Sequence, residues 1–301
     1  MTICAVDIGA RELKLLEARG RDLLRHAEVL LPEGALADGV PTPLFTAAVR
    51  GAVEGAGFHG SRVRVAIAET GTAFRDFRLP AMPSRDLAQA AMFEGRRQVP
   101  MDPGDVYFAW HAARDGKGYA IYLVAARREM IDGLIATLAS AGLRVERMDL
   151  KPLALARGLG IQDGLGLEWG AAEATLVFMH HGRPRFFRTF ALDAPGEEVD
   201  AQFEELALSL NALVKFMRGA AEVPIGRETP LYLGGRFAFL PEGLQRAQQR
   251  FDFTVQMPVT RFRAAADFPW QAHFAGLGLL GQRRWQPRIT PSQGGDIRVA
   301  A

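Results

Sequence analysis

The first residues of the chain that could bind a phosphate stand near its N-terminus, in the stretch CAVDIGARELKLLEA (residues 4–18). An apolar run there ends in Asp7, a turn follows at Gly9, and Lys14 lies on the next apolar run. Backbone N–H groups of such a turn can bind an anion, and a lysine adds a point charge. The same pattern suits an ordinary hairpin in which Asp7 caps its own backbone. At this point the sequence leaves both interpretations open.

A second stretch, residues 165–192, restarts this pattern. Glu168 and Gly170 have the same spacing and the same position after an apolar run as Asp7 and Gly9 in the first turn. The chain therefore contains a weak internal repeat. Further along, Gly234 and Gly235 end a strand-like run. Paired glycines let a backbone approach a ligand closely, although they also make tight turns.

Hydrophobic periodicity predicts the elements that must position these turns. Residues 3–31 read as three strands, a helix is expected over 43–56, and 62–68 read as a strand entering a core. A new unit begins near Gly71 with the order strand, helix, strand, strand, helix, and Ser84 is expected to cap its first helix. A long amphipathic helix is predicted from apolar residues at helical spacing: Val199, Phe203, Leu206, Leu210, Leu213 and Met217.

Composition excludes several classes of protein. The 301 residues are 49% hydrophobic, which suits one large or two globular domains. A net charge of +2 offers no basic stripe, so nucleic acid is not expected as a partner. The single cysteine, Cys4, excludes an internal disulfide, and His180 and His181 before a glycine predict a hairpin tip rather than a metal site. No apolar run is long enough to span a bilayer, so a cytoplasmic location is expected.

The duplicated hairpin, the second turn and the late strand with its glycine pair resemble the actin, sugar kinase and Hsp70 class of nucleotide-binding proteins. Within that class the chain is similar to the PilM family, actin-like proteins of type IV pilus assembly that are related to FtsA. The likeness runs from VDIGARELKLLEA through LPAMP and RRQVPMD to AGLGLLG. It implies an α/β fold of the duplicated, ribonuclease H-like actin type, with an inserted strand-helix-strand-strand small domain.

The resemblance also implies a division of the chain into parts. They are a first lobe (1–71), an inserted small domain (72–143), a return segment of the first lobe (144–163), a second lobe (164–264), a closing helix (265–285) and a flexible tail (286–301).

In proteins of this fold, the turns of the two lobes face each other across a cleft and hold the phosphates of ATP with Mg²⁺. Carried onto this sequence, the resemblance implies nine nucleotide-binding residues: Asp7, Gly9, Lys14, Asp149, Glu168, Gly170, Thr175, Gly234 and Gly235. Mg²⁺ would be held through Asp7, Asp149 or Glu168. No residue is assigned a catalytic role, and at most a weak ATPase activity is expected.

The sequence departs from the family pattern at both turns. Ala10, Arg11 and Glu12 stand where small hydroxyl residues are expected, and Glu168 replaces an aspartate. If the carboxylate of Glu173 pointed into the cleft, it would face a polyanion, and like charges about 4 Å apart repel by roughly 4 kcal/mol at an effective dielectric of about 20. A weak or degenerate ATP site is therefore expected.

The function that the resemblance implies is a scaffold at the inner membrane, held there through its partners. It would dock the cytoplasmic N-terminus of a PilN-like protein in a groove between the first lobe and the small domain. Other pilus assembly proteins are further possible partners. The aromatic stretches FRDF (74–77) and VYFAW (106–110) are candidate groove walls, or plain core.

Two alternatives belong to other functional classes. A small-molecule kinase of the same fold would need a catalytic base near the γ-phosphate, and no segment identifies one. An FtsA-like division protein or a GspL-like secretion component would carry an amphipathic C-terminal helix or a membrane-spanning segment, and neither is evident.

Overall fold

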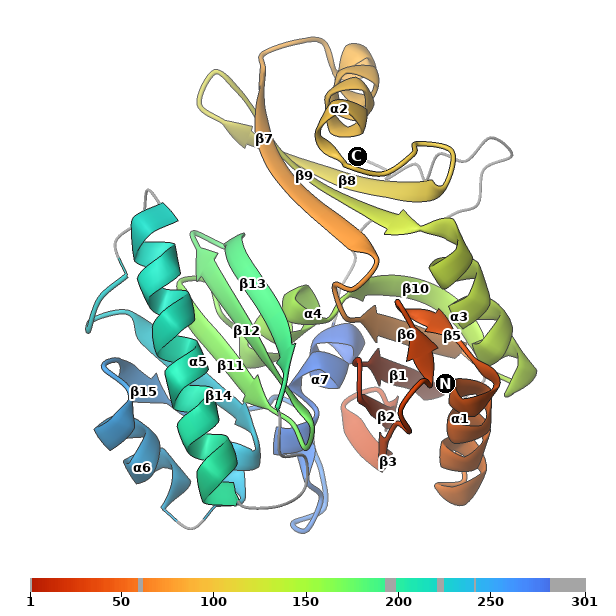
Figure 1. The fold of residues 1–301 in the computed structure, drawn as a ribbon, viewed down its shortest axis with the longest axis vertical. Helices are drawn as coiled ribbons and strands as arrows, with labels where there is room; N and C mark the ends of the chain where they lie inside the picture. The colour runs from red at the N-terminus through yellow and green to blue at the C-terminus, as the bar shows by residue number, and fades with distance from the viewer. Residues whose placement is uncertain (1, 59–61, 193–198, 221–224, 241, 282–301) are drawn as a thin grey trace.

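Two lobes and a small domain make up the computed structural model, which describes residues 2–58, 62–192, 199–220, 225–240 and 242–281 (Figure 1). The first lobe contains a five-stranded sheet of order β10-β6-β1-β2-β3. Its strands are β1 (Thr2–Ile8), β2 (Glu12–Arg19), β3 (Asp22–Leu30), β6 (Arg62–Ile67) and β10 (Arg144–Leu150). The three predicted N-terminal strands are therefore confirmed as an antiparallel meander, which β6 extends in parallel to β1.

The second lobe repeats this topology, with the order β13-β12-β11-β14-β15. Its strands are β11 (Gly164–Trp169), β12 (Glu173–His180), β13 (Arg183–Ala191), β14 (Pro230–Gly235) and β15 (Thr254–Gln256). A meander again comes first, and β14 again pairs in parallel with its first strand. The weak internal repeat in the sequence thus corresponds to a duplicated fold.

Helices form layers outside and between the two sheets (Figure 1). The outer face of the first sheet packs against α1 (Pro43–Gly55) and α3 (Arg128–Ser140), and that of the second against α5 (Val199–Ala220) and α6 (Gly243–Arg250). Between the sheets lie α4 (Lys151–Leu159) and α7 (Phe274–Leu280).

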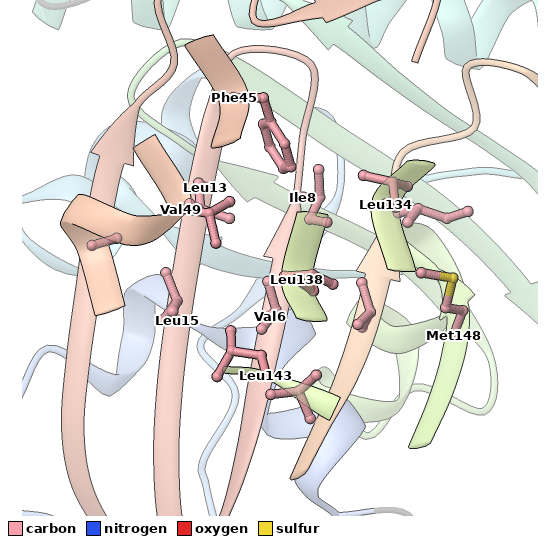
Figure 2. Close-up of a cluster of buried hydrophobic side chains, with 14 of the residues drawn as sticks. Val6, Ile8, Leu13, Leu15, Phe45, Val49, Leu134, Leu138, Leu143 and Met148 are labelled. Atoms are coloured by element: carbon pink, nitrogen blue, oxygen red, sulfur yellow. The ribbon is translucent and has the colours of Figure 1, made fainter. Parts of the chain in front are cut away.

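Alternation along the strands decides which residues face this middle layer. Figure 2 shows the outer core of the first lobe, in which residues of β1 and β2 meet residues of α1 and α3. Val6 and Ile8 of β1 point into that core. Because successive side chains of a strand point to opposite faces, Ala5 and Asp7 point toward the middle layer.

The middle layer depends on a close crossing of α4 and α7. A Cβ atom added at Gly158 would lie 1.8 Å from the carbonyl oxygen of Phe274, and one added at Gly278 would lie 1.8 Å from that of Ala154. Each helix therefore presents a glycine to the backbone of the other. Of the closing helix expected over 265–285, the α-helical part is α7, and 282–285 lie outside the described residues.

The inserted domain is a three-stranded sheet with one helix on one face (Figure 1). Its elements are β7 (Thr72–Pro80), α2 (Ser84–Gln98), β8 (Val106–Asp115) and β9 (Gly118–Arg127), with the sheet order β7-β9-β8. Ser84 does not cap α2, because it is already the first helical residue and Pro83 takes the cap position without a side-chain hydrogen bond.

The remaining elements are short. They are β4 (Leu36–Ala37), β5 (Val40–Pro41) and the 3₁₀ turns η1 (Arg236–Ala238) and η2 (Trp270–Ala272). His181 and Gly182 have φ values of 51° and 70° in the turn between β12 and β13, which confirms the predicted hairpin tip. In the described part of the chain, every helix is too short or too polar to cross a membrane. The predicted tail, 286–301, lies outside the described residues.

Candidate functional site

The two predicted turns meet between the lobes and share one local structure. In each, the glycine N–H donates to the carbonyl of a glutamate three residues later, Gly9 to Glu12 over 2.8 Å and Gly170 to Glu173 over 2.9 Å. The sequence Gly-x-x-Glu therefore forms both hairpin turns, at the ends of β1 and β11.

Each of these glutamates binds the turn of the opposite lobe. The Oε2 atom of Glu173 accepts hydrogen bonds from the N–H groups of Ala10 (2.7 Å) and Arg11 (3.2 Å). In return, Oε1 of Glu12 accepts from the N–H groups of Ala172 and Glu173, the latter over 3.2 Å. Both side chains are 1% exposed. We call these two carboxylates and the four amides they bind the carboxylate clasp.

The glycines of the turns make room for the clasp. A Cβ atom at Gly9 would lie 2.0 Å from Oε1 of Glu173, and one at Gly170 would lie 2.4 Å from Oε2 of Glu12. The carboxylates thus fill the space directly over each turn, so a side chain at either glycine would displace them.

Two buried lysines neutralise the clasp. The Nζ atom of Lys14 lies 3.2 Å from Oε2 of Glu12. The Nζ atom of Lys151, the first residue of α4, lies 2.6 Å from Oε1 of Glu173 and 3.5 Å from Oδ2 of Asp7. Burial opposes the charge of both lysines, but the surrounding carboxylates raise the pKa of each above its ordinary value.

The acids of this cluster respond differently to burial. Burial opposes the charge of Glu12, yet Lys14 and Lys151 lower the pKa of its carboxyl. For Asp7 and Glu168 burial prevails over the same lysines; it raises the pKa of Asp7, and that of Glu168 to about 7. The N–H of Phe274 donates to Oε1 of Glu168 over 3.2 Å, while its Oε2 has no partner among the described residues. Partial protonation of Glu168 near neutral pH reduces the excess of buried acids over lysines.

The substitution Glu168→Gln is therefore expected to change how stability depends on pH. Between about pH 4.5 and 7 the folded state holds a proton on Glu168 that the unfolded chain releases, so the free energy of unfolding falls as the pH rises. A pKa raised from 4.5 to about 7 makes that loss about 3 kcal/mol. Urea unfolding of wild type and variant at pH 4.5 and 7.5 should show the variant gaining about this much relative to wild type.

The exposed Glu54 on α1 offers the control Glu54→Gln, which should leave the pH dependence unchanged. Parallel pH profiles of wild type and Glu168→Gln would contradict the raised pKa.

Of the other predicted residues, Thr175 lies beside Glu168, whereas Asp149 lies on a strand that does not neighbour the one carrying Asp7. Thr175 pairs with Glu168 across β11 and β12, and its Oγ1 is 3.1 Å from that of Thr189. Asp149 is on β10, which β6 separates from β1. Its carboxylate accepts from Arg157 and from the N–H of Leu150.

The predicted glycine pair is held by packing. A Cβ at Gly234 would lie 2.6 Å from the ring of Phe274, and one at Gly235, whose φ is 75°, would lie 2.1 Å from the carbonyl oxygen of Trp169. Arg236 follows directly, donates to Oε1 of Gln202 over 2.6 Å, and places its guanidinium 6.0 Å from the Trp169 ring. A nucleotide-binding role for the nine residues stays a prediction.

The residues around the turns do not fit a bound phosphate as they stand, because the turn amides already donate to carboxylates. Sequence reasoning noticed Glu12 and Glu173 only as departures, and it gave Lys151 no role. The repeated Gly-x-x-Glu was the available signal.

Among the described residues, the one group with three ligand atoms within 4.8 Å is Asp163, His180 and His181 at the β12–β13 turn. The predicted Mg²⁺ ligands form no such group.

A separate cavity of about 820 Å³ lies under the inserted domain. The sheet β7-β9-β8 turns one face to α2 and the other to this cavity, because its strands alternate. The cavity face carries Phe74, Tyr107, Ala109, His111, Ala113, Tyr122, Val124 and Ala126. Apolar residues of the first lobe lie opposite, including Ile67, Ile131 and Met148. Burial lowers the pKa of His111 to about 4, so its ring is neutral at pH 7.

The two candidate wall stretches are divided between this cavity and the core. Phe74, Tyr107, Ala109 and Trp110 line the cavity. Phe77 and Phe108 instead pack into the core of the small domain, where Phe108 is 1% exposed. Each stretch is therefore partly wall and partly core.

Comparison with known proteins places the fold. No family model matches the chain, and no curated protein matches it. In fold it is similar to a chain of the PilM–PilN type IV pilus biogenesis complex, with a TM-score of 0.72 and 21% identity over 93% of this chain and 97% of that one. It is also similar to the cytoplasmic domain of EpsL, an inner membrane component of the Vibrio cholerae type II secretion system (TM-score 0.56, 14% identity, 94% and 97% covered).

A Bacteroides thetaiotaomicron protein of unknown function with an actin-like ATPase fold gives a TM-score of 0.50 at 11% identity, with 94% and 96% covered. These likenesses span nearly the whole chain, including the inserted domain. The protein thus has the duplicated actin-like ATPase fold that the sequence predicted, in a form similar to that found in the PilM–PilN complex.

Proposed function

We propose that the protein is a scaffold of a type IV pilus assembly complex, which docks the cytoplasmic N-terminus of a PilN-like inner-membrane protein in the cavity under the inserted domain. The observation that carries this proposal is the apolar sheet face turned toward that cavity. The similarity in fold between this protein and a chain of a PilM–PilN complex supports the choice of partner. The scaffold would then be peripheral at the inner membrane through this contact.

The cavity suits a peptide segment better than it suits a nucleotide. Its volume alone would suit either, because it falls within the roughly 300–1,000 Å³ of small-molecule and cofactor pockets. What favours a peptide is the cavity's sheet wall, which carries apolar and aromatic side chains. The charged side chains that line it are already engaged: Asp149 with Arg157, Arg183 with Asp115, and Arg261 with the carbonyl oxygen of Gly281. An apolar segment can therefore enter without separating an ion pair.

Filling the cavity tests this function. Ala109 lies on the cavity wall in β8, between Tyr107 and His111 along the strand and opposite Val124 of the central strand β9. The substitution Ala109→Phe should weaken binding of a labelled N-terminal peptide of the PilN-like protein at least about tenfold, because the new ring occupies the space of the peptide's side chains. Fluorescence anisotropy with the full chain measures the affinity.

The matched control is Ala47→Phe, which places the same ring on the exposed face of α1. It should bind the peptide as wild type does. Equal affinity of the two variants, or no binding of the peptide to folded wild type at high micromolar concentration, would reject the proposal.

A secretion-system scaffold is the second candidate, and the similarity to the EpsL cytoplasmic domain favours it. The same cavity would then receive a segment from a different inner-membrane protein. A peptide from that partner should bind wild type and lose affinity on Ala109→Phe, while the PilN-like peptide should not bind.

A further inference from the structure

We propose that the carboxylate clasp replaces a nucleotide in this protein: Glu12 and Glu173 take the turn amides that phosphate groups would need, and they hold the two lobes together. The inference concerns the crevice between the lobes and does not depend on which peptide the cavity binds.

Both carboxylates satisfy the contacts of a bound phosphate. An anion in a hairpin turn is held by consecutive backbone N–H groups and a nearby cation. Glu173 accepts from the consecutive amides of Ala10 and Arg11 and pairs with Lys151. Glu12 accepts from those of Ala172 and Glu173 and pairs with Lys14. Each glutamate is therefore a carboxylate substitute for a phosphate oxyanion.

The clasp is reciprocal, and this makes it a lock between the lobes. Glu12 belongs to the first lobe and binds the second, whereas Glu173 belongs to the second lobe and binds the first. Opening the crevice breaks both sets of hydrogen bonds at once. It also uncovers two carboxylates that are 1% exposed in the closed state.

An incoming nucleotide would have to displace both glutamates. Oε1 of Glu173 and Oε2 of Glu12 lie within 2.4 Å of the points where a Cβ atom would stand if Gly9 and Gly170 carried one. No second anion therefore fits over either turn. Their negative charges also oppose a polyphosphate at short range. The clasp therefore excludes nucleotide by volume as well as by charge.

Hydrogen exchange of the full chain tests the clasp by a crossed pattern. The substitution Glu173→Ala should speed exchange at the amides of Ala10 and Arg11 about 10- to 100-fold, since hydrogen bonds to a charged acceptor are lost. Glu12→Ala should instead speed exchange at Ala172. A general loss of stability would raise all these amides together. In each variant the remaining glutamate still binds its own amides, so these should accelerate less than the amides that have lost their acceptor. Acceleration by the same factor throughout the chain, including amides away from the crevice, or unprotected amides in wild type, would overturn the proposal.

Removal of both carboxylates should uncover an anion site. Wild type should show no binding of inorganic pyrophosphate by calorimetry, whereas Glu12→Ala/Glu173→Ala should bind it at least about 100-fold more tightly, because a like-charge repulsion of about this size disappears. Glu17→Ala removes another buried glutamate of β2, paired with Arg25 away from the crevice, and should not gain binding.

The conservative pair Glu12→Gln/Glu173→Gln covers the case in which the alanine variants do not fold. Glutamine keeps the size and an acceptor oxygen, so this variant removes the charge repulsion but still fills the space over each turn. It should bind pyrophosphate more tightly than wild type and less tightly than a folded alanine pair. Tight binding of pyrophosphate or ATP to wild type, equal to that of the folded variants, would show that the glutamates are not phosphate substitutes.

Discussion

Lys151→Met is expected to lower the free energy of unfolding by about 3–5 kcal/mol, the cost of removing one partner from a buried ion pair. Lys151 is 1% exposed and lies within ion-pair distance of both Asp7 and Glu173. Methionine has a similar length but no charge, so both carboxylates would lose their buried cation. Urea unfolding at pH 7.5 measures the loss.

The control is Lys215→Met on the exposed face of α5, which should change stability by no more than about 0.5 kcal/mol. The loss at Lys151 should also shrink at low pH, where the uncompensated acids are protonated. A loss below about 1 kcal/mol at pH 7.5 would mean that water reaches this cluster and that the lobes do not close over it.

Gly278→Ala is the second substitution with a large expected effect, a loss of at least about 3 kcal/mol. One methyl group there would lie 1.8 Å from the carbonyl oxygen of Ala154, a backbone atom that cannot turn aside. The helices α4 and α7 would have to separate, and the shared core between the two sheets would lose its packing. The midpoint of thermal or urea unfolding reports the change.

A glycine in open space provides the opposite expectation. Gly51→Ala on α1 adds a methyl group with no atom within 4 Å, and it should stabilise the protein by about 0.5–1 kcal/mol because alanine favours a helix. If both substitutions changed stability by the same small amount, the close crossing of α4 and α7 would be wrong.

The fold could be predicted because its signals are local and repeated. The alternation of Val6 and Ile8 with Asp7 fixes which face of β1 packs on the outer helices, and the same order of strands occurs twice along the chain. The residues Asp7, Gly9, Glu168 and Gly170 were predicted to meet across the lobes, and the contacts from Glu173 to Ala10 place these turns together.

The clasp itself depends on a contact between residues about 160 positions apart, which no local pattern encodes. Gly-x-x-Glu fits an isolated hairpin as well as a paired one, and Lys151 reads as an ordinary helix residue until the acids around it are known. The position of Asp149 was beyond local reasoning for the same reason: the strand order, with β6 between β10 and β1, sets it apart from Asp7.

The cavity walls come from three parts of the chain, and this links events at distant places. The inserted sheet touches the second lobe through the Phe74 and Phe187 rings, 5.1 Å apart, and through Arg183 with Asp115. Any change in the angle between the lobes must therefore reshape the pocket. Coupling of this kind is reciprocal. If an occupant binds the cavity more tightly when the lobes are closed, its binding must stabilise the closed lobes by the same free energy. This coupling between the occupant of the pocket and the angle between the lobes requires no nucleotide turnover.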